Sequence, residues 1–161
     1  MKPFHYVAWQ QDNLKVKGAE GMNRATRTKL LINVGRKQAI DMAQTMIENY
    51  EVFDLQPARE GLVMIKLRES AQQSLFYIGE VLVTEAKVKL QNALGVGLVI
   101  EHEPELARAL AIIDAAYNAN LPEIEEWEVI LNELQLLQQQ AQQEVKRSIE
   151  RTKVQFDTMT T

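Results

Sequence analysis

The stretch "GEVLVTEAKV", residues 79–88, decides how the middle of this chain folds. Apolar and polar residues alternate along it and valine recurs, which is typical of a β-strand with one face toward a core. Because the side chains of a strand alternate between its two faces, Glu80 and Glu85 point to opposite sides. The two carboxylates are therefore not expected to act together as an acid–base pair.

Glu80 is the only charged residue on the even-numbered face of this strand, which extends from Phe76 to Leu90. An unpaired carboxylate on such an apolar face would be costly, so we expect Glu80 to be buried and paired with a cation. A catalytic role for Glu80 is the alternative interpretation. Glu85 heads a charged row on the other face and is expected to be solvated.

The neighbouring stretches also have strand patterns. They indicate an antiparallel meander of four to five strands, with apolar runs at "YEVFDL" (50–55), "GLVMIKL" (61–67) and "SLFYIGEVLV" (74–83). Residues 84–101 favour a hairpin, because an alternating segment is followed by a second β-branched run. A short helix that begins at Thr84 and ends at Gly95 is the alternative for this segment.

Helical spacing of apolar residues appears on both sides of the strands. Residues 24–49 predict one helix, which Gly35 weakens or divides. Pro104 opens a second helix and Pro122 opens a third that continues to about residue 156, since proline is tolerated in the first helical turn. This last helix carries an apolar stripe with steps of three or four residues, which includes Trp127, Leu131, Leu134, Leu137, Val145, Ile149 and Phe156.

The C-terminal helix is too long for its own domain. It would extend about 50 Å, whereas a domain of this size is only about 30 Å across. The stripe therefore needs another chain to cover it, or the helix folds back at a break within "LQQQAQQE" (137–144). The prediction is an α+β protein with an extension at 1–23, a domain at 24–121, and a long C-terminal amphipathic helix with a tail at 122–161 that docks on a partner.

The extension at 1–23 has no sustained period and is expected to be loose. Docking of its aromatic residues Phe4, Tyr6 and Trp9 on a partner is the alternative.

Among the remaining motifs, "EHEPE" (101–105) sets His102 beside three carboxylates. We interpret these acidic residues as a helix N-terminus rather than a metal site, because the helix dipole favours negative charge there.

The composition excludes several classes of function. The formal net charge is −4 and no basic run is present, which argues against nucleic acid as a partner. Without cysteine the chain can form no disulfide and no thiolate metal site. No apolar run approaches the roughly 18 residues that cross a bilayer, so we expect a cytoplasmic protein. No phosphate-binding, hydrolase or metalloprotease motif is found, and no self-sufficient catalytic site is expected.

Four stretches, in order, resemble the G subunit of the bacterial phosphonate carbon–phosphorus lyase complex. They are "EGLVMIKLR" (60–68), "FYIGEVLVTEAKV" (76–88), "ARALAIIDA" (107–115) and "TKVQFDTM" (152–159). The resemblance extends from about Arg24 to Met159. It implies an obligatory subunit of a transferase complex in phosphonate catabolism.

The reaction that the resemblance implies is displacement of adenine from ATP by methylphosphonate, which gives α-D-ribose 1-methylphosphonate 5-triphosphate. Its implied partners are the H, I and J subunits, with the L subunit needed for activity and the I subunit housing most of the catalysis. ATP is then a substrate of the complex, and this chain alone is expected to bind no cofactor and no metal. The residues expected to face substrate or partner are Arg68, Glu80, Thr84 and His102.

This chain departs from the family pattern at several positions. The family has a glycine-rich turn at "SAQQS" (70–74), an arginine at Glu85, Gly-Arg-Asp at 101–103, and Val-Arg-Gly after Met159. Several of these changes remove positive charge, with His102 only a partial substitute. A non-enzymatic adaptor, which forms a homodimer through its long helix when isolated, is the second hypothesis.

Overall fold

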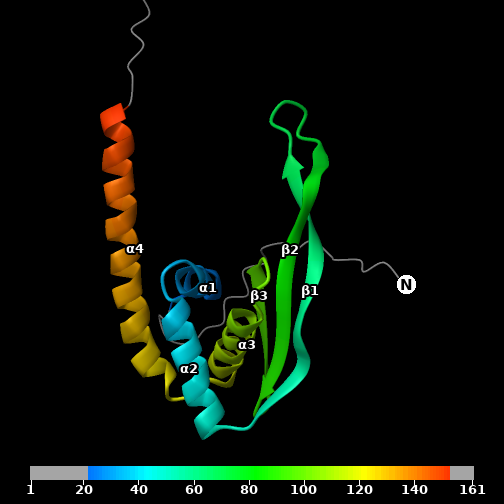
Figure 1. Cartoon of the computed structure of the whole chain (residues 1–161), viewed down its shortest axis with the longest axis vertical. Helices are drawn as coiled ribbons and strands as arrows, with labels where there is room; N and C mark the ends of the chain where they lie inside the picture. Colours follow the sequence, from blue (N-terminus) through cyan, green and yellow to red (C-terminus); the bar gives the residue numbers. More distant parts are fainter. Residues whose placement is uncertain (1–21, 153–161) are drawn as a thin grey trace, which may run out of the picture.

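The computed structural model describes residues 22–152 and has an α+β fold (Figure 1). Two helices precede a three-stranded antiparallel sheet with the strand order β1-β2-β3, and two helices follow it. The expected four to five strands are therefore wrong in number, and the expected N-terminal helix is divided in two. The elements are α1 (Arg24–Asn33), α2 (Arg36–Asn49), β1 (Val52–Arg68), β2 (Leu75–Leu90), β3 (Ala93–Ile100), α3 (Pro104–Ala119) and α4 (Ile124–Thr152).

The strand count differs because "QPARE" does not end a strand. β1 continues through Pro57 as an edge strand, where a missing N–H removes no necessary ladder hydrogen bond. The register shifts between Asp54 and Gln56, and again between Gln56 and Arg59, accommodate this segment. The hairpin predicted for 84–101 is confirmed, with β2 and β3 joined at Gln91, whose φ is 51°.

The N-terminal helical segment is divided at Gly35, as its pattern indicated. α1 ends at Asn33 and α2 begins at Arg36. A Cβ atom on Gly35 would lie 2.6 Å from Leu134 Cδ1, so glycine allows α4 to pass close to this bend. The division therefore serves packing between α1 and α4.

α3 is the central helix and packs directly on the sheet. A Cβ on Gly95 would lie 2.0 Å from the carbonyl oxygen of Ala111, and one on Gly97 would lie 1.9 Å from that of Ala107. Glycine at both positions lets the helix backbone approach β3 more closely than any side chain would permit. The core between sheet and helices includes Leu31, Met46, Val88, Leu90, Ile112 and Trp127.

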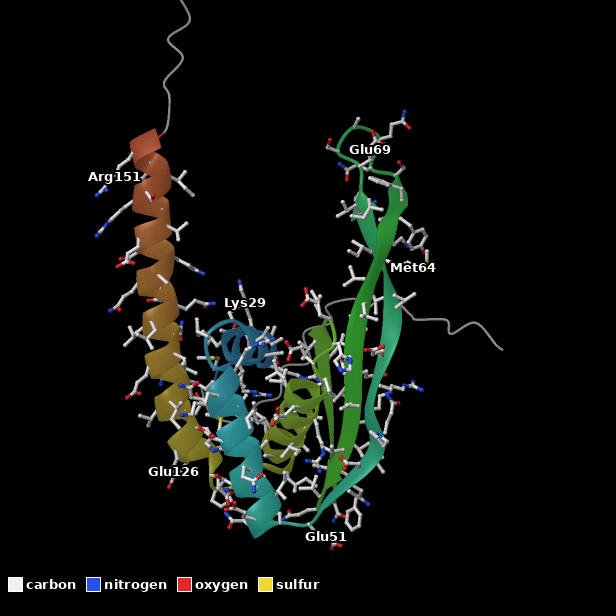
Figure 2. All side chains as sticks on the ribbon, viewed as in Figure 1. Lys29, Glu51, Met64, Glu69, Glu126 and Arg151 are labelled. Atoms are coloured by element: carbon white, nitrogen blue, oxygen red, sulfur yellow. The ribbon has the colours of Figure 1, made fainter. Side chains whose placement is uncertain are left out.

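Two arms extend from this body (Figure 1). β3 ends at Ile100, opposite Val83, so the β1–β2 hairpin continues beyond it as a two-stranded ribbon. We call residues 61–82 the hairpin arm and residues 136–152 of α4 the helix arm. Figure 2 shows Met64 and Glu69 on the first and Arg151 near the end of the second. The helices lie on one side of the sheet, and its other side is open (Figure 1).

Candidate functional site

Thr84 anchors the connection between β3 and α3. Its buried side chain donates a hydrogen bond from Oγ1 to the carbonyl oxygen of Glu101 at 2.7 Å. The same oxygen accepts a hydrogen bond from the backbone N–H of Glu103 at 3.1 Å. Glu101 has a left-handed backbone with a φ of 72°. One hydroxyl group thus fixes the path of residues 101–103.

Charged side chains gather on the surface above this anchor. His102 Nδ1 contacts Glu60 Oε1, and Arg36 Nη2 donates to Glu103 Oε1 at 2.7 Å. We call Arg36, Glu60, Thr84 and residues 101–103 the turn cluster. Glu60 is not among the residues predicted from the sequence, because only the pairing of Glu60 with Thr84 across β1 and β2 brings it here.

Arg68 and Glu80 lie apart from the turn cluster, on the hairpin arm. Arg68 Nη1 donates to the carbonyl oxygen of Gln73 at 2.7 Å and closes the tip of the hairpin. Glu80 is exposed opposite Met64 and makes no ion pair within residues 22–152. The expectation that Glu80 is buried and paired is wrong, because no helix covers β2 beyond the end of β3.

Glu85 was expected to be solvated because it heads a charged row, but the structure shows it partly buried and paired. Its side chain is 22% exposed and lies 3.1 Å from Lys87 Nζ and 3.7 Å from Arg59 Nη2. Gln56 also donates a hydrogen bond to it at 2.9 Å. Burial raises the pKa of Glu85, but the hydrogen bonds from Gln56 and Lys87 and the nearby cations outweigh it, so the net pKa is lowered.

The buried carboxylate of this domain is Asp114 on α3. It accepts hydrogen bonds from Arg24 at 2.7 and 2.8 Å and from Arg27 at 3.4 Å. It also accepts the backbone N–H of Val96 at 3.1 Å, while the C=O of Val96 accepts a hydrogen bond from Arg24 at 3.3 Å. Asp114 therefore joins α1, α3 and the edge strand β3. The only sequence signal for it was a single charge within the apolar run "ALAIIDAA" (109–116).

The buried Arg27 continues this network toward α4. Its guanidinium lies 3.5 Å from the centre of the Tyr117 ring, and the Tyr117 hydroxyl donates to Glu128 at 3.0 Å. Burial lowers the pKa of Arg27, and burial with the neighbouring Glu128 raises the pKa of Tyr117. The network is fully satisfied, since no buried side-chain polar atom in the described residues lacks a hydrogen-bond partner. Its role is structural.

The charged side chains of the turn cluster lie at the surface of the described residues. Within residues 22–152, no group of three or more His, Asp or Glu side chains is placed to hold a metal ion. A depression of about 440 Å³ lies at the other end of β3, beside Gln91, Leu94 and Asn118. The turn cluster presents charged and hydrogen-bonding side chains at this surface. No helix in this part of the chain is long and apolar enough to cross a membrane.

The apolar stripe on α4 divides into two parts. Trp127, Leu131 and Leu134 are buried in the chain's own core. Further along, Leu137, Val145 and Ile149 are exposed by 57%, 60% and 62%. The alternative in which the helix folds back is wrong, because α4 continues without a break to Thr152. Phe156 at one end of the chain, and Phe4, Tyr6 and Trp9 at the other, lie outside the described residues.

Comparison with known proteins identifies the family. The family model described as phosphonate metabolism protein PhnG matches residues 22–161. No curated protein gives a significant match to the chain. The match covers most of the sequence and includes both arms, the turn cluster and the Asp114 network. The chain therefore belongs to the PhnG family, and this membership implies a role in phosphonate metabolism.

Proposed function

We propose that this chain is a docking subunit of the complex that forms α-D-ribose 1-methylphosphonate 5-triphosphate from ATP and methylphosphonate with release of adenine. Its partners are the H, I and J subunits, with the L subunit required for activity, and the I subunit carries most of the catalysis. The family match supports this division of labour. The chain by itself holds no cofactor in this proposal, and ATP is a substrate of the whole complex.

The observation that carries the proposal is the exposed stripe of the helix arm. Leu137, Val145 and Ile149 share one side of a helix that stands clear of the body (Figure 1). Apolar residues arranged in this way are typical of a helix that lies in a partner's groove. We propose that this stripe buries against the I subunit.

The hairpin arm supplies a second docking surface. Its apolar side chains are exposed on both faces of the ribbon and include Leu62, Met64, Leu67, Phe76, Tyr77 and Ile78. A two-stranded ribbon without a covering layer is marginally stable in water, so a partner that encloses it would stabilise it. Arg68 and Glu80 lie on this arm and then face the partner.

In the same proposal, the turn cluster faces the substrate side of the assembly. His102 is 69% exposed at its side chain and supplies a cation when protonated, next to Arg36. Thr84 is buried and acts by holding residues 101–103 in place. It is therefore a positioning residue in this scheme.

Substitution of the stripe tests the docking proposal. The complex would be assembled from co-expressed subunits with Leu137→Asp, Val145→Asp or Ile149→Asp in this chain, and with Gln143→Asp on the opposite face of α4 as the control. We expect the stripe variants to lose co-purification with the I subunit and adenine release, while Gln143→Asp retains both. Unchanged co-purification of all three stripe variants would contradict the proposal.

The same exposed stripe could also form the interface of a homodimeric adaptor. Measuring the mass of the isolated chain by light scattering distinguishes the two proposals. A stable dimer that ignores the I subunit, and that Val145→Asp dissociates, would favour the adaptor. A chain that binds the I subunit in preference to itself supports the docking subunit.

A further inference from the structure

The sheet has two edge strands, and they differ in how their outer edges are bonded. On β3, the N–H of Val96 is bound by Asp114 and its C=O by Arg24, so an added strand would have to displace these bonds. On β1, no backbone group of residues 60–68 is bonded to a side chain within residues 22–152. Every second residue of an antiparallel strand directs its N–H and C=O away from its neighbour. The edge of β1 therefore offers a row of backbone groups to another strand.

The open part of this edge is short and regular. It begins beyond the register shifts around Pro57 and ends at Arg68, where the hairpin turns. The single irregularity between these limits places its extra residue, Ile78, on β2, so β1 itself stays regular. The midpoint of residues 60–68 is Met64, which Figure 2 shows below the tip of the hairpin arm. A symmetric pairing of this segment with its own copy is therefore centred on Met64.

The charges along the segment are complementary to those of a second copy. When two such strands pair antiparallel about Met64, Glu60 lies opposite Arg68 of the second copy, and Arg59 lies opposite Glu69. Two-fold symmetry repeats both pairings, which gives four contacts between opposite charges. Centring the pairing one residue earlier keeps only one kind of opposite-charge contact, and centring it one residue later keeps none. The charge pattern thus favours one register.

The present bonds of these side chains allow the additional contacts. Glu60 contacts His102 through one carboxylate oxygen, and Arg68 donates to Gln73 through one guanidinium nitrogen. A carboxylate has about four acceptor sites and a guanidinium has about five N–H donors, so each group can keep its bond and meet an opposite charge. A two-stranded ribbon is also marginally stable in water, and a sheet of more strands is more stable.

We infer that β1 pairs with β1 of a second copy of this chain, antiparallel about Met64, so that two hairpin arms form one four-stranded sheet. A single strand edge is at the low end of interface sizes, where complexes are weak and transient. The dimer therefore depends on concentration, and dilution returns the hairpin arm to a two-stranded ribbon. This inference is independent of the proposed function, because the pairing uses the edge of the arm and leaves its faces and the helix arm to partners.

Reversal of the facing charges tests this dimer on the full-length chain. Sedimentation equilibrium measures the dimer dissociation constant. We expect Glu60→Arg and Arg68→Glu each to raise this constant by about tenfold or more, because each change places like charges opposite each other twice. The double variant exchanges the two charges and should restore the dimer. Glu133→Arg makes the same change of charge on α4 and is the control, which should leave the constant unchanged.

Cross-linking at the centre of the pairing reports the register. The chain has no cysteine, so Met64→Cys places a single thiol opposite its own copy. The two Cα atoms would lie about 4.5–5.5 Å apart, which a disulfide can span, and mild oxidation should give a covalent dimer. Leu82→Cys, 40% exposed on β2 of the same arm, is the matched control. Three strand spacings of about 4.8 Å separate Leu82 from its copy, so no covalent dimer should form there.

Two results would overturn the inference. A dimer that persists unchanged in both single charge variants, and that Val145→Asp dissociates, would place the interface on the helix arm. Equal cross-linking of Met64→Cys and Leu82→Cys, or no cross-linking of either at high protein concentration, would show that β1 does not pair about Met64.

Discussion

At the scale of single residues, the buried charge of this protein is Asp114 and not Glu80. Both are lone acidic residues within apolar runs. Asp114 lies on a helix that is enclosed on nearly all sides, and two arginines and a backbone N–H surround it. Glu80 lies on a ribbon that has no cover. A lone charge in an apolar run therefore indicates burial only where the element itself is enclosed.

Removing the charge of Asp114 should destabilise the fold strongly. Asp114→Asn would leave the buried Arg27 without its counter-charge, which typically costs about 3–5 kcal/mol. Urea unfolding followed by circular dichroism measures the change. The control is Asp54→Asn, since the ion pair between Asp54 and Arg108 is about one-third exposed and its loss should cost less than about 1 kcal/mol. Equal effects of the two substitutions would contradict the structural role of Asp114.

Glu101 has a strained, left-handed backbone with a φ of 72°. A non-glycine residue in the left-handed region destabilises the folded state by roughly 1–2 kcal/mol. Glycine removes this strain, but its greater freedom in the unfolded chain offsets about 0.5–1 kcal/mol of the gain. Glu101→Gly should therefore raise the free energy of unfolding by about 0.5–1 kcal/mol. Glu101→Ala keeps the strain without the side chain and should bring no gain. If both variants were equally stabilised, the side chain and not the backbone would be the cause.

At the scale of elements, β2 is buried along one half and exposed along the other. From Thr84 to Leu90, the even positions of β2 are buried, as the alternation predicted. From Leu75 to Glu80, every residue is exposed. The exposed half is the more apolar of the two, but α3 and β3 cover only the half from Thr84 to Leu90. Burial along β2 is therefore set by the lengths of its neighbours.

The contact between α3 and β3 gives a prediction at this scale. Gly97→Ala places a Cβ atom 1.9 Å from the carbonyl oxygen of Ala107, so the helix must move away from the sheet. We expect a loss of stability at the upper end of the roughly 1–3 kcal/mol typical of overpacking. Gly61→Ala, where no atom lies within 4 Å, is the control and should change the melting temperature little. A tolerated Gly97→Ala would show that α3 is less closely fixed.

At the scale of the whole molecule, a compact body carries two arms that lack a covering layer. Hydrogen exchange should therefore divide the free chain into regions. Amides of residues 62–78 and 145–152 should exchange fast, whereas those of residues 109–116 in α3 should be protected, because α3 is buried in the core. In the assembled complex, both arms should gain protection while α3 stays unchanged. Arms that are already protected in the isolated chain would contradict this division.

Much of the arrangement followed from local patterns. The order of helices and strands, the hairpin at 84–101 and the over-long α4 all rest on periodicity and on the placement of proline and glycine. The predicted strand count was wrong because the runs 50–55 and 61–67 belong to one strand, since an edge strand tolerates Pro57. Of the turn cluster, Thr84 and His102 were named from the sequence, but Glu60 was not, because cross-strand register joins residues far apart in the chain.

The sequence alone determined the family, the α+β class and the presence of a helix longer than its domain, because motifs and periodicity are local properties of the chain. The tertiary structure alone decided that Glu80 is exposed, that Asp114 is the buried anchor, and that the α4 stripe is covered as far as Leu134 and exposed from Leu137 onward. The physical reason is that burial depends on which elements lie over a residue. In this protein, β1, β2 and α4 all extend beyond the elements that cover them (Figure 1).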